Sequence, residues 1–237
     1  MGGDPKERNW LGLEDASRVT VRYYWEEEAS VAPDTSRVPP LRIEAVVPGL
    51  PTPPPCDDSV AAGIRRVAEF VRARTLGFPP MAEAEQQPAF VGLTPNEFPS
   101  PVPPGDFALS AFDAAYSLAP YYLGPDEALV LTGRWPECIF ANLNLWNRFQ
   151  QSYDYATRQI SLNRKQTVLQ ADGTFRIILA HRDPGVENWI DTEGAAMGLV
   201  FWRFMLPQSD IETPQAEVVP FDSIASTKSF DEGVNHE

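Results

Sequence analysis

Residues 138–149 read CIFANLNLWNRF, and apolar and polar side chains alternate along this stretch. Successive side chains of a β-strand point to opposite faces, so this alternation predicts a strand with two different faces. The apolar face comprises Ile139, Ala141, Leu143 and Leu145. The opposite face carries Phe140, Asn142, Asn144 and Trp146. The stretch is therefore expected to form one strand of a sheet whose apolar face lies against a core.

Four further strand-like runs flank this stretch, at residues 128–135, 158–169, 174–181 and 197–206. Asp172-Gly173 is a strong signal for a two-residue hairpin between the second and third of these runs. The last run is apolar on both faces, which indicates a central, covered strand. Short strands separated by turn signals favour a sandwich over a βαβ fold. We therefore expect a mainly β protein, an antiparallel jelly-roll-like β-sandwich with one connecting α-helix.

The chain divides by composition into four parts. Most of the 24 prolines lie between Pro33 and Pro104, a distribution typical of connecting coil. Within it, apolar residues recur at helical spacing from Val60 to Val71, which predicts a helix at residues 58–76 that packs outside the sandwich. The predicted parts are a partial copy of the β domain (1–48), a proline-rich connector with the helix (49–104), the β-sandwich domain (105–221) and a disordered acidic tail (222–237).

The charge balance excludes several classes of partner. Lys and Arg number 19 against 33 Asp and Glu, which gives a formal net charge of −14. Such a chain repels phosphate backbones and anionic lipid surfaces, so neither nucleic acid nor a membrane surface is expected as a partner. No apolar run approaches the roughly 20 residues that span a membrane, and the polar start does not resemble a signal peptide. Cys56 and Cys138 form no CxxC pair, which favours free thiols and a cytoplasmic location.

The beginning of the chain echoes its end. Residues 9–11 and 19–24 match residues 188–190 and 199–204 in order, and residues 44–48 match residues 216–220. These matches indicate a degenerate internal repeat whose first copy lacks its earlier strands, through truncation of a longer ancestor or a misplaced start. The strand predicted at residues 19–25 therefore needs a sheet edge. It either completes the main sandwich or pairs with a second copy of the chain or a partner domain.

Five short motifs follow one another through the second half of the chain. They are GRWP at 133–136, LWNR at 145–148, SLNR at 161–164, DG at 172–173 and HRDPGVENW at 181–189. In order and spacing these motifs resemble the DUF1214 family, and the resemblance covers about residues 118–219. It implies a jelly-roll β-sandwich, often found beside another β domain, with no established biochemical activity. With this resemblance, the N-terminal repeat is similar to a truncated second copy of the same domain.

Asn142, Asn144 and Trp146 share one strand face and form the first candidate site. Amides hydrogen-bond to hydroxyl groups, and an indole ring stacks on the C–H faces of a sugar. Asparagine is disfavoured inside strands, which raises the functional interpretation, while an ordinary solvent-facing sheet stays the favoured alternative. This site predicts a non-catalytic module that binds a small polar ligand or a glycan, or that supports a partner domain.

An enzyme is the alternative. His181 and Asp183 lie two residues apart, and a carboxylate beside an imidazole raises its basicity, as a general base requires. The substrate-binding candidates are Arg134, Arg164 and Arg203 for an anionic group, and Asn163 for a hydrogen bond. Such a site would abstract a proton or hydrolyse a small ester. Against it, the sequence contains no nucleophile motif, and His181 shares a strand face with apolar residues, as a packed core histidine does.

The remaining candidates have structural interpretations. Arg203 lies on an otherwise apolar strand, so its guanidinium needs a carboxylate, with Asp183 and Asp191 as the nearest choices. Asn188 is expected to tie its turn through its side chain, and Trp189 to plug the end of the sandwich. A single histidine in the β region and scattered carboxylates give no metal-ligand spacing, so neither a metal nor a cofactor is expected.

Overall fold

A computed structural model shows a mainly β protein. It describes residues 12, 19–29, 34–37, 42, 44, 54–75, 88–104 and 111–226. The chain divides into two units, the first being Met1–Tyr24 with Asp34–Phe70 and the second Trp25–Pro33 with Val71–Glu237. Every strand among the described residues belongs to the second unit.

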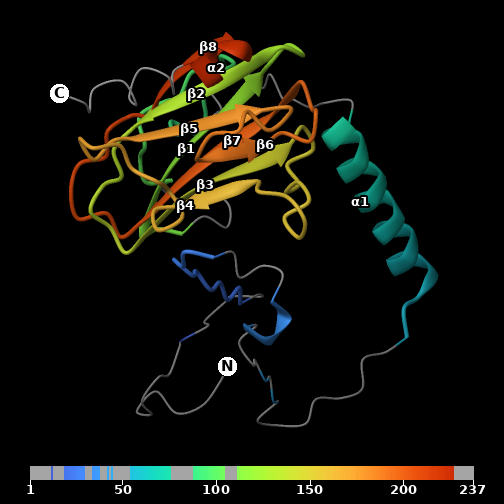
Figure 1. Cartoon of the computed structure of the whole chain (residues 1–237). Helices are drawn as coiled ribbons and strands as arrows, with labels where there is room; N and C mark the ends of the chain where they lie inside the picture. Colours follow the sequence, from blue (N-terminus) through green and yellow to red (C-terminus); the bar gives the residue numbers. More distant parts are fainter. Residues whose placement is uncertain are drawn as a thin grey trace, which may run out of the picture. The chain divides into compact units, whose positions relative to one another are not determined.

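The second unit holds two four-stranded sheets (Figure 1). The first sheet has the order β1-β7-β3-β4, with β1 at Ala114–Tyr122, β7 at Met197–Met205, β3 at Phe140–Asn147 and β4 at Ser161–Asn163. The second sheet has the order β6-β5-β2-β8, with β6 at Trp189–Asp191, β5 at Phe175–Ala180, β2 at Glu127–Gly133 and β8 at Gln215–Pro220. Strands were thus correctly predicted at β2, β3, β5 and β7.

One strand pair departs from the antiparallel arrangement that the sequence predicts. β5 and β6 run parallel, with Ile178 opposite Trp189 and Ala180 opposite Asp191. Two consecutive strands can pair in parallel only if the connection between them runs from the end of the first strand back to its beginning. Residues 181–188 are sufficient for this return because β6 is only three residues long.

The turn at Asp172-Gly173 forms, and the predicted hairpin is reduced to one antiparallel bridge between Leu169 and Phe175. Gly173 has a φ of +81°, and its N–H donates to the carbonyl oxygen of Gln170 at 2.9 Å. The run predicted at residues 158–169 contributes β4, which pairs with β3 in the first sheet, and Leu169, which bridges to the start of β5. β5 belongs to the second sheet, so the turn lies on a crossover between the sheets. Turn chemistry fixes local geometry, whereas the choice of sheet depends on distant pairing partners.

A single core joins the two sheets. Trp202 of β7 and Phe175 of β5 are fully buried and stack with their ring centroids 5.5 Å apart. On β3, the side chains of Ala141, Leu143 and Leu145 are completely buried in this core, as the alternation predicts. Ile139 was wrongly assigned to the core; its side chain is 60% exposed because it precedes the first residue of β3.

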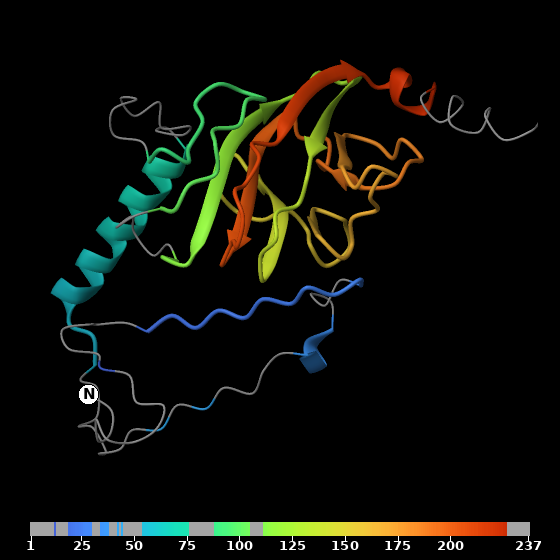
Figure 2. The same ribbon diagram turned by 90° about the vertical axis from the view of Figure 1, so that its left-hand side faces the viewer.

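The outer face of the second sheet is closed by a smaller apolar cluster. Ala128, Val130, Ile178 and Ala180 are buried there beneath Ile224, which is only 1% exposed. Ile224 belongs to the short helix α2 (Asp222–Ser226), which follows directly on β8 (Figure 2). Residues 222–226 are therefore helical, although the acidic composition predicted disorder from residue 222 onwards.

Helix α1 (Asp57–Thr75) confirms the helix predicted at residues 58–76, and a 3-10 turn, η1, spans Thr35–Arg37. That α1 packs outside the sandwich stays a prediction. None of the helices among the described residues has the length and apolarity needed to cross a membrane.

The strand expected at residues 19–25 is not formed, since residues 19–29 belong to neither a helix nor a strand. Val19, Val21 and Tyr23 are 45–55% exposed. Alternating apolar residues make a strand only where a sheet edge pairs with them, and this segment has no such ladder. The other parts of the first repeat, residues 9–11 and most of 44–48, lie outside the described residues, as does the tail from residue 227.

Candidate functional site

The strand register gathers several predicted residues on the outer face of the first sheet. Asn142 of β3 lies between Arg203 of β7 and Asn163 of β4, and Tyr116 of β1 lies on the other side of Arg203. In the next row, Phe201 lies beside Asn144, and further along Trp146 is opposite Leu199. The part of this surface that concerns us, hereafter the amide–aromatic face, comprises Asn142, Asn144, Trp146, Phe201 and Arg203.

Aromatic rings form a stack across this face. The Phe201 ring lies between Tyr116, at a centroid distance of 5.2 Å, and Trp146, at 4.6 Å, with both ring pairs inclined by 20°. The guanidinium carbon of Arg203 lies 5.0 Å from the Phe201 centroid, within the range of a cation–π interaction. Tyr116 and Phe201 are buried and Trp146 is half-buried. Arg203 is thus associated with aromatic rings, and neither Asp183 nor Asp191 forms an ion pair with it.

The two amides of this face are half-buried. The Oδ1 atom of Asn142 is itself buried and accepts no hydrogen bond from a described residue. A buried acceptor without a donor costs on the order of 1–3 kcal/mol. The outer face therefore holds an acceptor that is closed to water and has no donor among the described residues.

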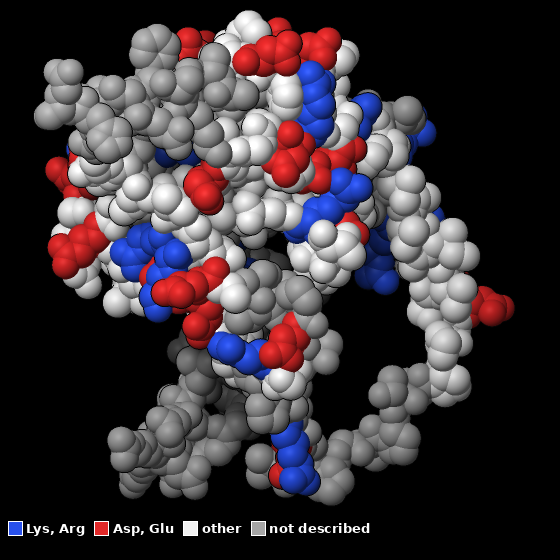
Figure 3. Space-filling model, in the orientation of Figure 1, with Lys and Arg blue, Asp and Glu red and all other residues white. Residues whose placement is uncertain are grey.

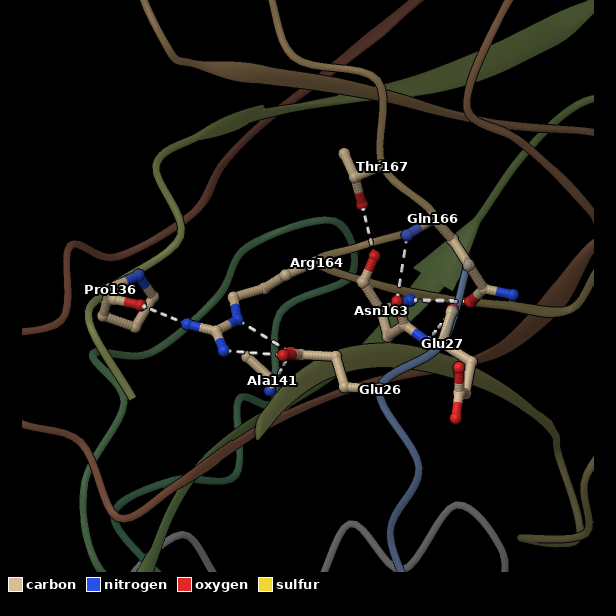
Figure 4. Close-up of polar contacts among 8 residues, drawn as sticks. All are labelled: Glu26, Glu27, Pro136, Ala141, Asn163, Arg164, Gln166 and Thr167. Carbon is tan, nitrogen blue, oxygen red and sulfur yellow. Dashed lines mark hydrogen bonds and ion pairs between the residues drawn. The ribbon is translucent and has the colours of Figure 1, made fainter. Parts of the chain in front are cut away.

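At the β3–β4 edge of the same sheet, Arg164 binds the carboxylate of Glu26 (Figure 4). Arg164 donates from Nε to Oε1 and from Nη2 to Oε2 of Glu26, both at 2.7 Å. The N–H of Ala141 donates to Oε1 at 3.3 Å, and Arg164 Nη1 donates to the carbonyl oxygen of Pro136 at 3.4 Å. The hydrogen bond to Glu26 raises the pKa of Arg164 above its ordinary value. The pair is mostly shielded from water, with side-chain exposures of 26% for Arg164 and 14% for Glu26.

Asn163 makes a second contact with the same segment, through its backbone. Its Nδ2 atom donates to the carbonyl oxygen of Glu27 at 3.0 Å. The Asn163 amide is fixed in place because its Oδ1 accepts the N–H of Gln166 at 2.9 Å, while Gln166 Oε1 accepts the N–H of Asn163 at 3.0 Å. Asn163 and Arg164 thus hold residues 25–29, hereafter the arm, on the first sheet.

The structure does not bring His181 and Asp183 together. His181 Nδ1 lies 2.6 Å from the hydroxyl of the fully buried Thr192. Asp183 instead accepts the N–H of Gly185 at 2.7 Å, in a local turn. Asp191 binds Arg158 at 2.5 Å. The proposed general base therefore lacks the carboxylate contact on which it depends.

The remaining candidates lie away from the amide–aromatic face. Asn188 has a φ of +58°, and its side chain bonds distant backbone instead of its own turn: Oδ1 accepts the N–H of Val168, and Nδ2 donates to the carbonyl oxygens of Val168 and Arg176. Trp189 does not plug the end of the sandwich, because its parallel register directs it to the outer face of the second sheet. Arg134 is exposed and donates to the carbonyl oxygen of Asp172 beside the turn.

The charges of the described residues indicate an ordinary solvated surface. On the face shown in Figure 3, basic side chains are interspersed with acidic ones. Within the described part of the chain, no group of three or more His, Cys, Asp or Glu side chains has the geometry of a metal site.

Comparisons with known proteins support the fold but name no function. A scan against protein-family models finds no match, and a search of curated proteins finds no relative. Among solved structures, an uncharacterized protein from Burkholderia cenocepacia aligns with a TM-score of 0.56 and 26% identity, over 73% of this chain and 47% of that one. The VPA0106 protein from Vibrio parahaemolyticus aligns with a TM-score of 0.39 and 12% identity, over 71% and 47%. The chain thus spans about half the length of each of these structures.

Proposed function

We propose that this chain is a non-catalytic module, a jelly-roll-like β-sandwich resembling the DUF1214 family, that binds a small polar ligand on its amide–aromatic face. A short glycan is the ligand class that suits this face best. The observation that carries the proposal is the pair of half-buried side chains Asn144 and Trp146, which share one strand face beside the Phe201 ring. The two free cysteines are compatible with a cytoplasmic location for the module.

The chemistry of the face matches a sugar in three respects. The half-buried Asn144 amide offers a sugar hydroxyl both a hydrogen-bond donor and an acceptor. Trp146 uses one ring neighbour, Phe201, and its half-exposed indole is able to stack on a sugar ring. Asn142 and Trp146 are four residues apart on a strand, a separation of about 13 Å. That span suits two linked rings better than a single one.

The enzyme alternative has less support. It depends on a His181–Asp183 pair, and each of these side chains has another hydrogen-bond partner. Arg203 also lies over the Phe201 ring and forms no ion pair with Asp183 or Asp191, so it is not placed to assist His181. The predicted site residues that do share one surface are Asn142, Asn144 and Trp146, and their side chains suit ligand binding.

The test is an NMR titration with maltose, cellobiose, diacetylchitobiose and digalacturonate. At least one disaccharide is expected to shift the side-chain signals of Asn142, Asn144 and Trp146. Asn144→Ala and Trp146→Ala should each weaken that binding about tenfold, corresponding to about 1.4 kcal/mol. Trp189→Ala is the matched control, since this half-buried tryptophan lies on the outer face of the other sheet and should leave binding unchanged. Absence of any shift at millimolar ligand would rule out the proposal.

A further inference from the structure

We propose that Arg164, the N–H of Ala141 and the amide of Asn163 form a receptor for an extended acidic peptide, and that the chain's own arm occupies this receptor. The inference goes beyond the proposed ligand function, because the receptor recognises a polypeptide and lies at the β3–β4 edge. Its two anchor points are one residue apart in the bound segment: a glutamate side chain and the following backbone carbonyl.

The first anchor is specific for a carboxylate. Three N–H groups converge on the two oxygens of Glu26, and Arg164 supplies two of them as a planar fork. Paired arginine–carboxylate bonds demand a planar acceptor with two oxygens, so an amide in place of Glu26 would leave one N–H facing another donor. Because water is largely excluded from the pair, the attraction is stronger than that of an exposed ion pair.

The second anchor fixes the course of the peptide backbone. Asn163 is 8% exposed, and it donates to a group that every residue carries, the carbonyl oxygen of Glu27. Because Gln166 already holds the Asn163 amide in position, little conformational freedom is lost when a peptide binds. The receptor therefore selects a glutamate at one position and an extended backbone after it.

The mode of attachment makes the arm a bound ligand rather than part of the sheet. Residues 19–29 form neither a helix nor a strand, so no ladder of backbone hydrogen bonds joins the arm to β3 or β4. A tethered ligand competes at an effective concentration that reaches about the millimolar range. A free peptide should therefore bind the native chain weakly, and binding should strengthen once the arm loses its carboxylate.

The experiment measures binding of a fluorescent peptide, acetyl-YYWEEEA-amide, which reproduces residues 23–29. Fluorescence anisotropy is followed with the full chain and with four variants: Glu26→Ala, Glu28→Ala, Glu26→Ala combined with Arg164→Ala, and Asn144→Ala. Glu26→Ala should bind the peptide at least about tenfold more tightly than the native chain because the tethered competitor is weakened. Adding Arg164→Ala should remove that gain. Glu28→Ala, in the exposed neighbour of Glu27, is the matched control and should behave like the native chain.

A second measurement changes the peptide and keeps the Glu26→Ala chain as the receptor. A peptide with glutamine at the position of Glu26 should bind the Glu26→Ala chain at least about tenfold more weakly than the original peptide. Equal binding of the two peptides would overturn the proposal, as would a Glu26→Ala chain that binds no better than the native one. Asn144→Ala separates the two proposals, since it should weaken sugar binding and leave peptide binding unchanged.

Discussion

The outer faces of the two sheets differ in what covers them. On the second sheet, Val130 and Ile178 are buried beneath Ile224 of α2 in a cluster of apolar side chains. On the first sheet, the covering segment is the arm, which is held by an ion pair and an amide hydrogen bond. Asn144 and Trp146 stay half-exposed beside it.

This difference separates stability from recognition. Apolar contacts contribute wherever water is excluded and have little preference for a particular partner. Paired charges and oriented amides contribute less net stability but discriminate strongly among partners. The apolar cluster on the second sheet therefore stabilises the fold. The polar contacts on the first sheet select for the arm and would allow another acidic peptide to replace it.

The largest effect should come from the closed face. Ile178→Ala removes a completely buried side chain between β5 and α2 and should lower the free energy of unfolding by about 2–5 kcal/mol. Asn144→Ala, on the half-exposed face, should change it by no more than about 0.5 kcal/mol. Urea denaturation at pH 7 measures both values. Equal losses would mean that the two faces do not differ in this way.

An intermediate effect is expected from a matched pair of asparagines. Asn188→Ala loses three side-chain hydrogen bonds and puts alanine at a φ of +58°, so it should cost about 2–3 kcal/mol. Asn142→Ala removes a buried oxygen that has no hydrogen-bond donor, so stability should not fall and should rise by up to about 1–3 kcal/mol. Thermal and urea unfolding report both. A large loss for Asn142→Ala would show that its amide supports the fold.

The smallest effect at neutral pH is expected from two tyrosine hydroxyls on the inner side of the first sheet, whose contribution to stability changes only at alkaline pH. Burial raises the pKa of both Tyr121 and Tyr153, whose hydroxyls lie 2.8 Å apart. An unfolded tyrosine ionises near pH 10, and the folded chain holds the proton more tightly, so this stability is complete below pH 10 and declines above it. The decline should reach about 1.4 kcal/mol per pH unit for each tyrosine. Urea unfolding between pH 8 and 12 measures it.

Tyr121→Phe provides the control for this pH dependence. The variant has one titrating hydroxyl fewer, so its stability should fall less steeply above pH 10 than that of the native chain. An unchanged slope would mean that other groups cause the alkaline loss.

Local patterns were sufficient to predict β2, β3, β5 and β7 and the side-chain directions on β3, but not β1, β6 or β8. Alternation separated Leu143 from Asn142 and Asn144, and helical spacing located α1 to within a residue at each end. The candidate surface was predicted in part for the same reason, since the amides and Trp146 lie on a single strand. Phe201 was accessible to similar reasoning, because it lies two residues before Arg203 on β7.

Contacts between distant segments could not be predicted in this way. Arg164 and Glu26 are 138 residues apart, and nothing near either residue indicates the other. The position of Tyr116 beside Arg203 depends on the register of β1 against β7. The hydrogen-bond partner of His181 was predicted wrongly. Because β6 pairs in parallel with β5, Thr192, which follows β6, lies next to His181, which follows β5, and it bonds the imidazole instead of Asp183.

The alternation along β3 has a consequence for how this protein can change over generations. Even-numbered positions from 140 to 146 face outward, and odd-numbered positions from 141 to 145 fill the core. Substitutions at the outward positions can alter what the surface recognises while the interior stays intact. An insertion or deletion of one residue would exchange the two sets and destroy both. Selection on this strand should therefore tolerate replacement far better than any change in length, and an engineer could vary positions 142, 144 and 146 together as a small library.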